Sequence, residues 1–190
     1  MKRIIFLFAL ILSLVSFSFP AFATDINPIP SIDAYANQYR QSYDVIKKAF
    51  ATNATEDFDT ALSQFERDRD KLDNDFFNRR TNDYKNYRKE FIASQSCTNG
   101  VSGKKKDCPA APIICPTNTF IKSGDYTLVG GGGSLLGVTD NRIDWRVRKT
   151  GKGRNEATIN VKCRYKDSFV AQSVKNDISK IRELIVNTRV

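Results

Sequence analysis

Residues 142–149 and 157–165 each alternate between polar and apolar side chains, as half-buried strands do. The segment between them contains two glycines, so the two runs predict a β-hairpin with one apolar and one cationic face. The cationic face holds Arg142, Arg146, Arg148, Lys162 and Arg164. Guanidinium groups bind phosphate and carboxylate in a planar, bidentate way, so this face is the candidate site for an anionic ligand.

The alternative for the same face is a solvated surface that holds no ligand. Asp144 and Glu156 would then screen part of its positive charge. Like charges directly across a strand pair destabilise it, so the cluster requires either carboxylate partners or a bound anion. The run Lys104–Lys106 adds cationic side chains in a segment that is more typical of a solvated loop.

Four cysteines without a C-x-x-C spacing favour structural disulfides over a redox or metal site. Cys163 shares a strand face with Ile159 and Val161, so we expect it to face the core. Three pairings of the cysteines are possible. We predict the pairs Cys115–Cys163, which ties this strand to the segment before the first strand, and Cys97–Cys108, which closes the lysine-rich loop.

The sequence predicts no catalytic, metal or cofactor site. It contains no histidine, which excludes Ser-His-Asp and Cys-His catalysis. The glycine run at 130–133 lacks the Gly-Lys-Ser/Thr of a phosphate-binding loop. We therefore predict a protein that is not an enzyme, with an exported hydrolase built on two distant carboxylates as the alternative.

Residues 31–95 contain neither glycine nor proline, and their apolar side chains recur at steps of three and four. This predicts a helix over 31–51, capped by Ser31, and a second over 54–95, started by Asn53 or Thr55. The short connection favours an antiparallel hairpin, a coiled-coil-like stalk within residues 24–95. Since the first helix can cover only about half of the second, the rest of the apolar stripe requires the C-terminal domain, the last helix or another subunit. The last of these alternatives would be a homo-oligomer formed through the helices.

The rest of the chain predicts a connector and a β domain. Residues 96–116 are rich in Cys, Pro and Lys and have the composition of a turn-rich connector. Residues 117–190 predict a basic β domain with strands at 120–122, 126–129 and 134–138 before the hairpin, and an amphipathic helix at 169–187 after it. That helix would pack on the sheet or back on the helical hairpin.

The predicted fold class is therefore α+β. An N-terminal helical hairpin precedes a small, disulfide-stapled antiparallel β domain, which a C-terminal helix closes.

Residues 1–23 follow the order of an export signal. Lys2 and Arg3 precede the apolar run Ile4–Val15, and Ala21-Phe22-Ala23 supplies a cleavage site before Thr24. The run is too short for a stable membrane span, and we expect no span in the mature chain. Bacterial Sec export would place the mature protein in the periplasm or outside the cell, where disulfides persist.

Charge is divided unevenly along the mature chain. Residues 24–96 carry eleven Lys and Arg against thirteen Asp and Glu, whereas residues 97–190 carry seventeen against eight. A field of this kind attracts polyanions. We therefore predict a non-enzymatic exported binding protein that contacts an anionic envelope component through the basic hairpin: lipopolysaccharide, an acidic glycan or an anionic lipid surface. The alternative is a structural or protein-interaction component of an envelope or secretion assembly that acts through its helices.

Overall fold

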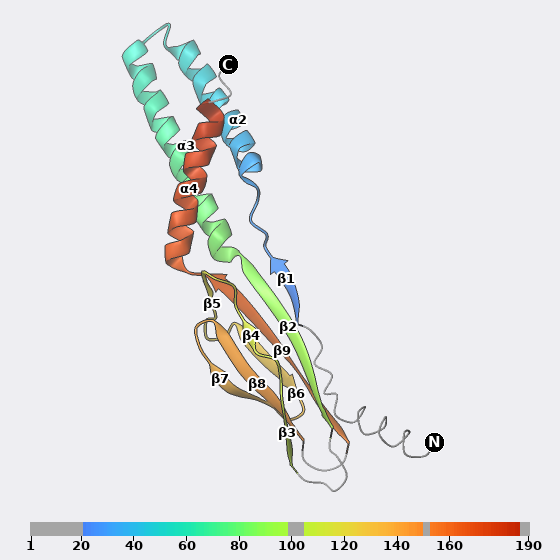
Figure 1. Cartoon of the computed structure of the whole chain (residues 1–190). Helices are drawn as coiled ribbons and strands as arrows, with labels where there is room; N and C mark the ends of the chain where they lie inside the picture. The colour runs from blue at the N-terminus through green and yellow to red at the C-terminus, as the bar shows by residue number, and fades with distance from the viewer. Residues whose placement is uncertain (1–20, 99–104, 150–152, 187–190) are drawn as a thin grey trace. The chain divides into compact units, whose positions relative to one another are not determined.

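The structure is a computed structural model that describes residues 21–98, 105–149 and 153–186, with only the backbone at Val186. It divides into two compact units (Figure 1). Within these described ranges, the β unit comprises residues 21–26 and 88–164, and the helical unit comprises residues 27–87 and 165–186. The predicted α+β class is confirmed: a helical hairpin, antiparallel sheets with two disulfides, and a C-terminal helix.

The helical hairpin consists of α2 (Ile32–Asn53) and α3 (Phe58–Asn86). Ser31 caps α2 as predicted, because its hydroxyl accepts the Ala34 N–H at 3.2 Å. The predicted start of the second helix was wrong. Asp57 is the cap of α3, and its side chain accepts the Thr60 N–H at 3.1 Å. Asn53 cannot cap α3 because it is still part of α2.

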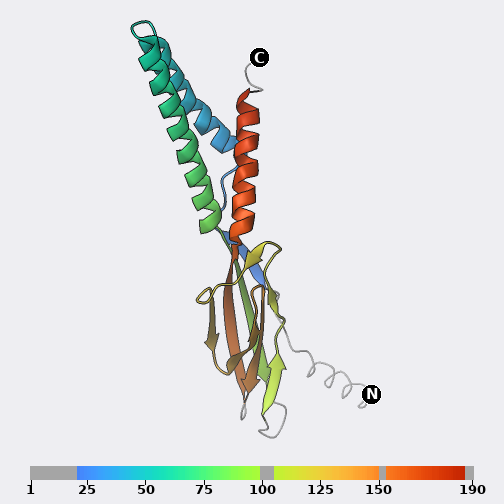
Figure 2. The ribbon, with the colours of Figure 1, turned by 90° about the vertical axis from the view of Figure 1, so that its left-hand side faces the viewer.

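The C-terminal helix α4 (Asp167–Val186) belongs to the helical unit and packs on the α2–α3 hairpin (Figure 2). Of the two packings expected for the C-terminal helix, on the sheet or on the helical hairpin, the structure shows the second. The buried side chains at the centre of the three helices are Tyr35, Ala36, Tyr39, Phe76 and Ile181. Aromatic rings thus fill much of this core, and Phe76 packs edge-on against both tyrosines.

The prediction that the second helix extends to residue 95 was wrong. Helix α3 ends at Asn86, and strand β2 (Arg88–Thr98) follows. Phe91 lies four residues after Tyr87, a step that fits one helical turn and also two strand repeats. The side chains of Ala93, Gln95 and Cys97 are buried at every second position, which is the strand period.

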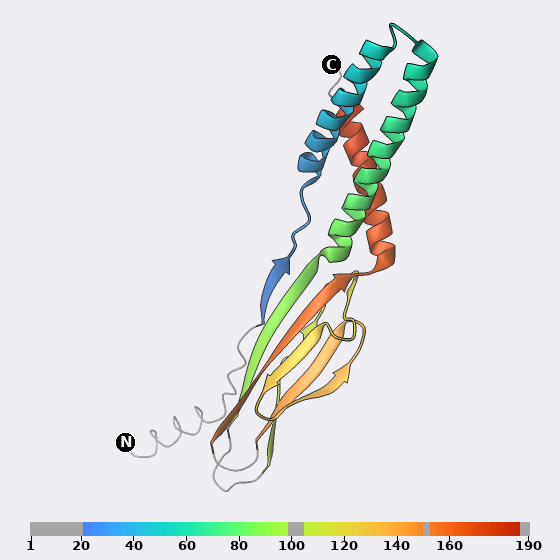
Figure 3. The same ribbon diagram turned by 180° about the vertical axis from the view of Figure 1, so that it is seen from behind.

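Two antiparallel sheets form the β unit. One contains β1 (Phe22–Ile26), β2 and β9 (Arg154–Tyr165), with β5 (Thr119–Phe120) and β6 (Tyr126–Gly130) on the far side of β9. In the other, β8 (Arg142–Lys149) pairs with β3 (Lys106–Pro109), β4 (Ile113–Ile114) and β7 (Gly133–Val138). Figure 3 shows β2 and β9 side by side, and their pairing runs from Lys89 to Thr98.

The predicted pairing of β8 with β9 was wrong, because the two strands belong to different sheets. The backbone of β9 bonds to β2 and β6, and the backbone of β8 bonds to β3, β4 and β7. Their apolar faces meet instead in one buried core, where Trp145 of β8 and Val161 of β9 both lie. Of the expected turn at 150–155, residues 150–152 lie outside the described residues, whereas Arg154 and Asn155 belong to β9.

Both predicted disulfides are confirmed. Cys97 and Cys108 have Cα atoms 5.6 Å apart, and Cys115 and Cys163 have Cα atoms 5.7 Å apart. All four side chains are buried in the core of the β unit. Part of the segment expected to be a connector, 96–116, is therefore built into the sheets as the end of β2 and as β3 and β4.

Among the described residues, no helix combines the length and the apolar composition that a membrane crossing requires.

Candidate anion-binding site

Strand β8 carries the site on its outer face. Ile143, Trp145 and Val147 point inward and are at most 1% exposed. The side chains between them therefore point away from the core, as the alternation predicts. Trp145 also anchors the strand, because its indole N–H donates to the carbonyl of Ala111 at 3.1 Å.

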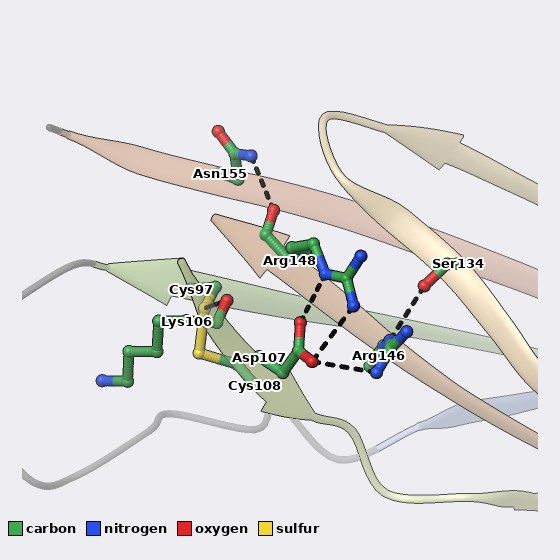
Figure 4. Close-up of polar contacts among 8 residues, drawn as sticks. All are labelled: Cys97, Lys106, Asp107, Cys108, Ser134, Arg146, Arg148 and Asn155. Carbon is green, nitrogen blue, oxygen red and sulfur yellow. Dashed lines mark hydrogen bonds and ion pairs between the residues drawn. A yellow bond between two sulfur atoms is a disulfide. The ribbon is translucent and has the colours of Figure 1, made fainter. Parts of the chain in front are cut away.

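Two arginines of this face share one carboxylate (Figure 4). Arg148 Nε donates to Asp107 Oδ1 at 2.7 Å, and Arg146 Nη1 donates to Asp107 Oδ2 at 2.9 Å. Arg146 Nε also donates to the Ser134 hydroxyl at 3.2 Å. These four residues come from β3, β7 and β8, and we call them the arginine site.

The electrostatics of the arginine site follow from this sharing. The hydrogen bond from Arg148 and the positive charges of Arg146 and Arg148 hold the pKa of Asp107 below its usual range. In turn, the hydrogen bond and the charge of Asp107 raise the pKa of Arg148. With two guanidinium groups and one carboxylate, the site carries one net positive charge at neutral pH.

The disulfide Cys97–Cys108 positions the carboxylate of the arginine site. Cys108 follows Asp107 directly in β3, and the bridge ties this short strand to the end of β2. The register of β3 on β8 places Asp107 opposite Arg148 and Pro109 opposite Arg146. The short strand β3, held by this disulfide, therefore places Asp107 between the two arginines.

Arg142 lies on the same face but has its own partner. Its guanidinium donates to Asp144, two residues along β8, at 2.7–3.0 Å. The hydrogen bond from Arg142 lowers the pKa of Asp144. This pair adds no net charge to the face. Asp144 thus screens one cation of the face, as the alternative of a solvated surface without a ligand predicted.

The structure does not bring the last two predicted cations to this site. Lys162 and Arg164 lie on β9, in the other sheet, which corrects the predicted five-residue face. Lys162 Nζ lies 4.0 Å from a carboxylate oxygen of Glu90, and Arg164 is hydrogen-bonded to Asp125. Burial alone would raise the pKa of Asp125, but the hydrogen bonds and charge of Arg164 outweigh it and lower that pKa.

Sequence reasoning missed Asp107 and Ser134. Each lies twelve or more residues from the arginine that it bonds. The one local signal was the position of Asp107 beside a cysteine, in a segment expected to be a loop. Lys104 and Lys152 lie outside the described residues.

The described ranges hold no group of three or more His, Cys, Asp or Glu side chains placed to bind a metal ion. Comparison with known proteins returned no match to any protein-family model, to any curated protein or to any solved structure.

Proposed function

We propose that this chain is a non-enzymatic, exported binding protein that holds anionic groups of the cell envelope at the arginine site. The observation that carries the proposal is the sharing of Asp107 by Arg146 and Arg148. One carboxylate cannot neutralise two guanidinium groups, so a phosphate or carboxylate of a ligand would complete the charge balance.

Accessibility supports the same proposal. The side chain of Arg148 is 46% exposed and that of Arg146 is 28% exposed, so a ligand would reach both without unfolding. Their carboxylate partner and Ser134 hold them in place beforehand, which reduces the entropy lost on binding. Lys162 and Arg164 lie on the other sheet and do not belong to the proposed site.

Two disulfides support an oxidising, extracytoplasmic location, since such bonds are rare in reducing compartments. The predicted leader at 1–23 supports the same location through Sec export. The envelope ligands that such a protein would meet include lipopolysaccharide phosphates, acidic glycans and anionic lipid headgroups.

The test is salt-dependent binding of the oxidised protein to these ligands, with three variants. Arg146→Gln/Arg148→Gln should weaken binding by about tenfold or more, since hydrogen bonds between charged groups are the stronger class. Asp107→Asn should strengthen it, because a competing carboxylate is removed. Lys162→Gln, on the other sheet, removes a positive charge outside the arginine site and should bind as the wild type does. Equal affinity of all four proteins would refute the proposal.

A second candidate function is assembly through the helices. In the helical hairpin, Val45 of α2 is 67% exposed and Phe58, the first residue of α3, is 57% exposed. Large apolar side chains at this exposure are typical of a contact surface when they gather in one region. The observation favours the structural alternative, and the variant Val45→Asp described below tests it, because loss of association in that variant would place the contact on the helices.

A further inference from the structure

Strand β2 has one edge that is only partly covered. On one side it pairs with β9 from Lys89 to Thr98. On the other side β1 pairs with Arg88–Ile92 alone, and Figure 3 shows β1 ending partway along β2. Within the described ranges, no strand pairs with the outer edge of Ala93–Thr98.

Export would lengthen this open edge. Phe22 and Ala23 of β1 pair with Ile92 and Phe91. Cleavage after Ala23, as the leader predicts, removes both residues and leaves only Thr24–Ile26 of β1. The mature protein would then present the backbone of Phe91–Thr98 without a neighbour on that side.

The open edge lacks the features with which proteins block edge-to-edge pairing. Such edges are commonly protected by charged side chains, prolines or bulges. Residues 91–98 contain no charged residue and no proline, and their register with β9 is continuous. The edge strands of the other sheet differ: β3 contains Lys106, Asp107 and Pro109, and β7 has a register shift between Leu135 and Gly137.

We propose that the open edge of β2 pairs antiparallel with the same edge of a second copy of the chain. An uncharged edge offers no counter-charge to a charged strand, so its electrostatic complement is an uncharged strand of the same kind. Antiparallel pairing of two identical strands is self-complementary about a two-fold axis, and it closes at two copies. The sheets of both copies then join into one sheet, with backbone hydrogen bonds supplying the contact.

The side chains on this edge suit a sheet that continues into a neighbour. Ser94 and Ser96 are half-buried on the outer face, and Ile92 beside them is 39% exposed. Ser94 is already within 2.8 Å of the Thr158 hydroxyl across the strand pair with β9. Small hydroxyl side chains next to one aliphatic side chain leave room for a neighbouring strand to approach. This proposal is independent of the arginine site, which lies on the other sheet.

The experiment uses the chain recovered after export. Its mass is measured by light scattering over a range of concentrations, and its amide exchange is measured on each side of the dissociation range. We expect a dimer in which the amides within 93–98 that point away from β9 are protected and become exchangeable on dilution. Ser96→Lys should give a single-chain mass, because lysine on each copy repels its counterpart.

Two controls locate the contact. Thr127→Lys places the same charge on β6, the opposite edge of the same sheet, and should remain dimeric. Val45→Asp alters the helical surface and should also remain dimeric. Trp145 fluorescence, unchanged from the wild type, would show that Ser96→Lys keeps its core. A wild-type monomer at every concentration, a dimer with unprotected 93–98 amides, or dissociation by Val45→Asp instead of Ser96→Lys would each overturn the proposal.

Discussion

A single buried arginine connects three segments of the helical unit. Arg80 is 3% exposed, and its guanidinium donates to Asp177 of α4 at 2.7 Å and to the carbonyl of Pro30 at 2.6 Å. The Tyr84 hydroxyl donates to the same carboxylate at 2.9 Å. A buried ion pair contributes little net stability, but removal of one partner leaves the other charge buried and unpaired.

Arg80→Met should therefore lower the free energy of unfolding by about 3–5 kcal/mol. Urea denaturation followed by circular dichroism at 222 nm measures the change. Arg69→Met is the control, since Arg69 pairs with Asp70 at the surface and both side chains are exposed. Its effect should stay within about 0.5 kcal/mol. Equal effects of the two substitutions would contradict the role assigned to Arg80.

At the scale of elements, hydroxyl–carboxylate pairs join α2 to α3. Tyr35 donates to Asp83, and Tyr39 donates to Asp73 at 2.6 Å. Burial, the hydrogen bond to Asp83 and the negative charge of Asp83 raise the pKa of Tyr35 to about 12. Burial and Asp73 likewise raise the pKa of Tyr39. The folded hairpin therefore favours the neutral, protonated form of both tyrosine side chains.

This predicts alkaline destabilisation of the hairpin. Each tyrosine has a raised pKa in the folded state, so its stabilisation is complete below its unfolded pKa of about 10. For Tyr35 it is lost as the pH rises from that value toward about 12. The urea midpoint at 222 nm should therefore stay level below about pH 9 and fall as the pH rises from about 10 toward about 12. Tyr35→Phe/Tyr39→Phe should show a smaller fall over the same range, and an identical fall would argue against these pairs.

At the scale of the whole molecule, both disulfides lie in the β unit. Their loops span 48 and 11 residues in sequence, so the longer one restricts the unfolded chain more. Trp145 is the single tryptophan of the chain and is buried in the same unit. Its fluorescence therefore reports on the β unit, whereas the signal at 222 nm reports mainly on the helices.

Replacing Cys115 and Cys163 by serine should lower the stability of the β unit by about 4 kcal/mol, and replacing Cys97 and Cys108 by about 3 kcal/mol. Urea denaturation followed by Trp145 fluorescence tests both values and their order. The second pair of substitutions should also release Asp107 from the arginine site and change the affinity for anions. An unchanged fluorescence midpoint in both variants would show that neither bridge stabilises this core.

Much of the local structure follows from the amino-acid sequence. Period-two alternation located β8 and β9 and showed which side chains of each face the core, and the step of three and four located α2 and α4. The inward position of Cys163 was enough to predict both disulfides. These features depend on side-chain periods within a few residues, which a sequence displays directly.

The choice of strand partners and of charge partners, in contrast, depends on the tertiary structure. The sequence did not show that β8 and β9 lie in different sheets, that β2 replaces the end of a helix, or that Asp107 lies between Arg146 and Arg148. Backbone hydrogen bonds are available on both sides of every strand, and side-chain alternation does not select the neighbour. That choice depends on contacts between segments far apart in the chain, which also determine where each charged side chain finds its partner.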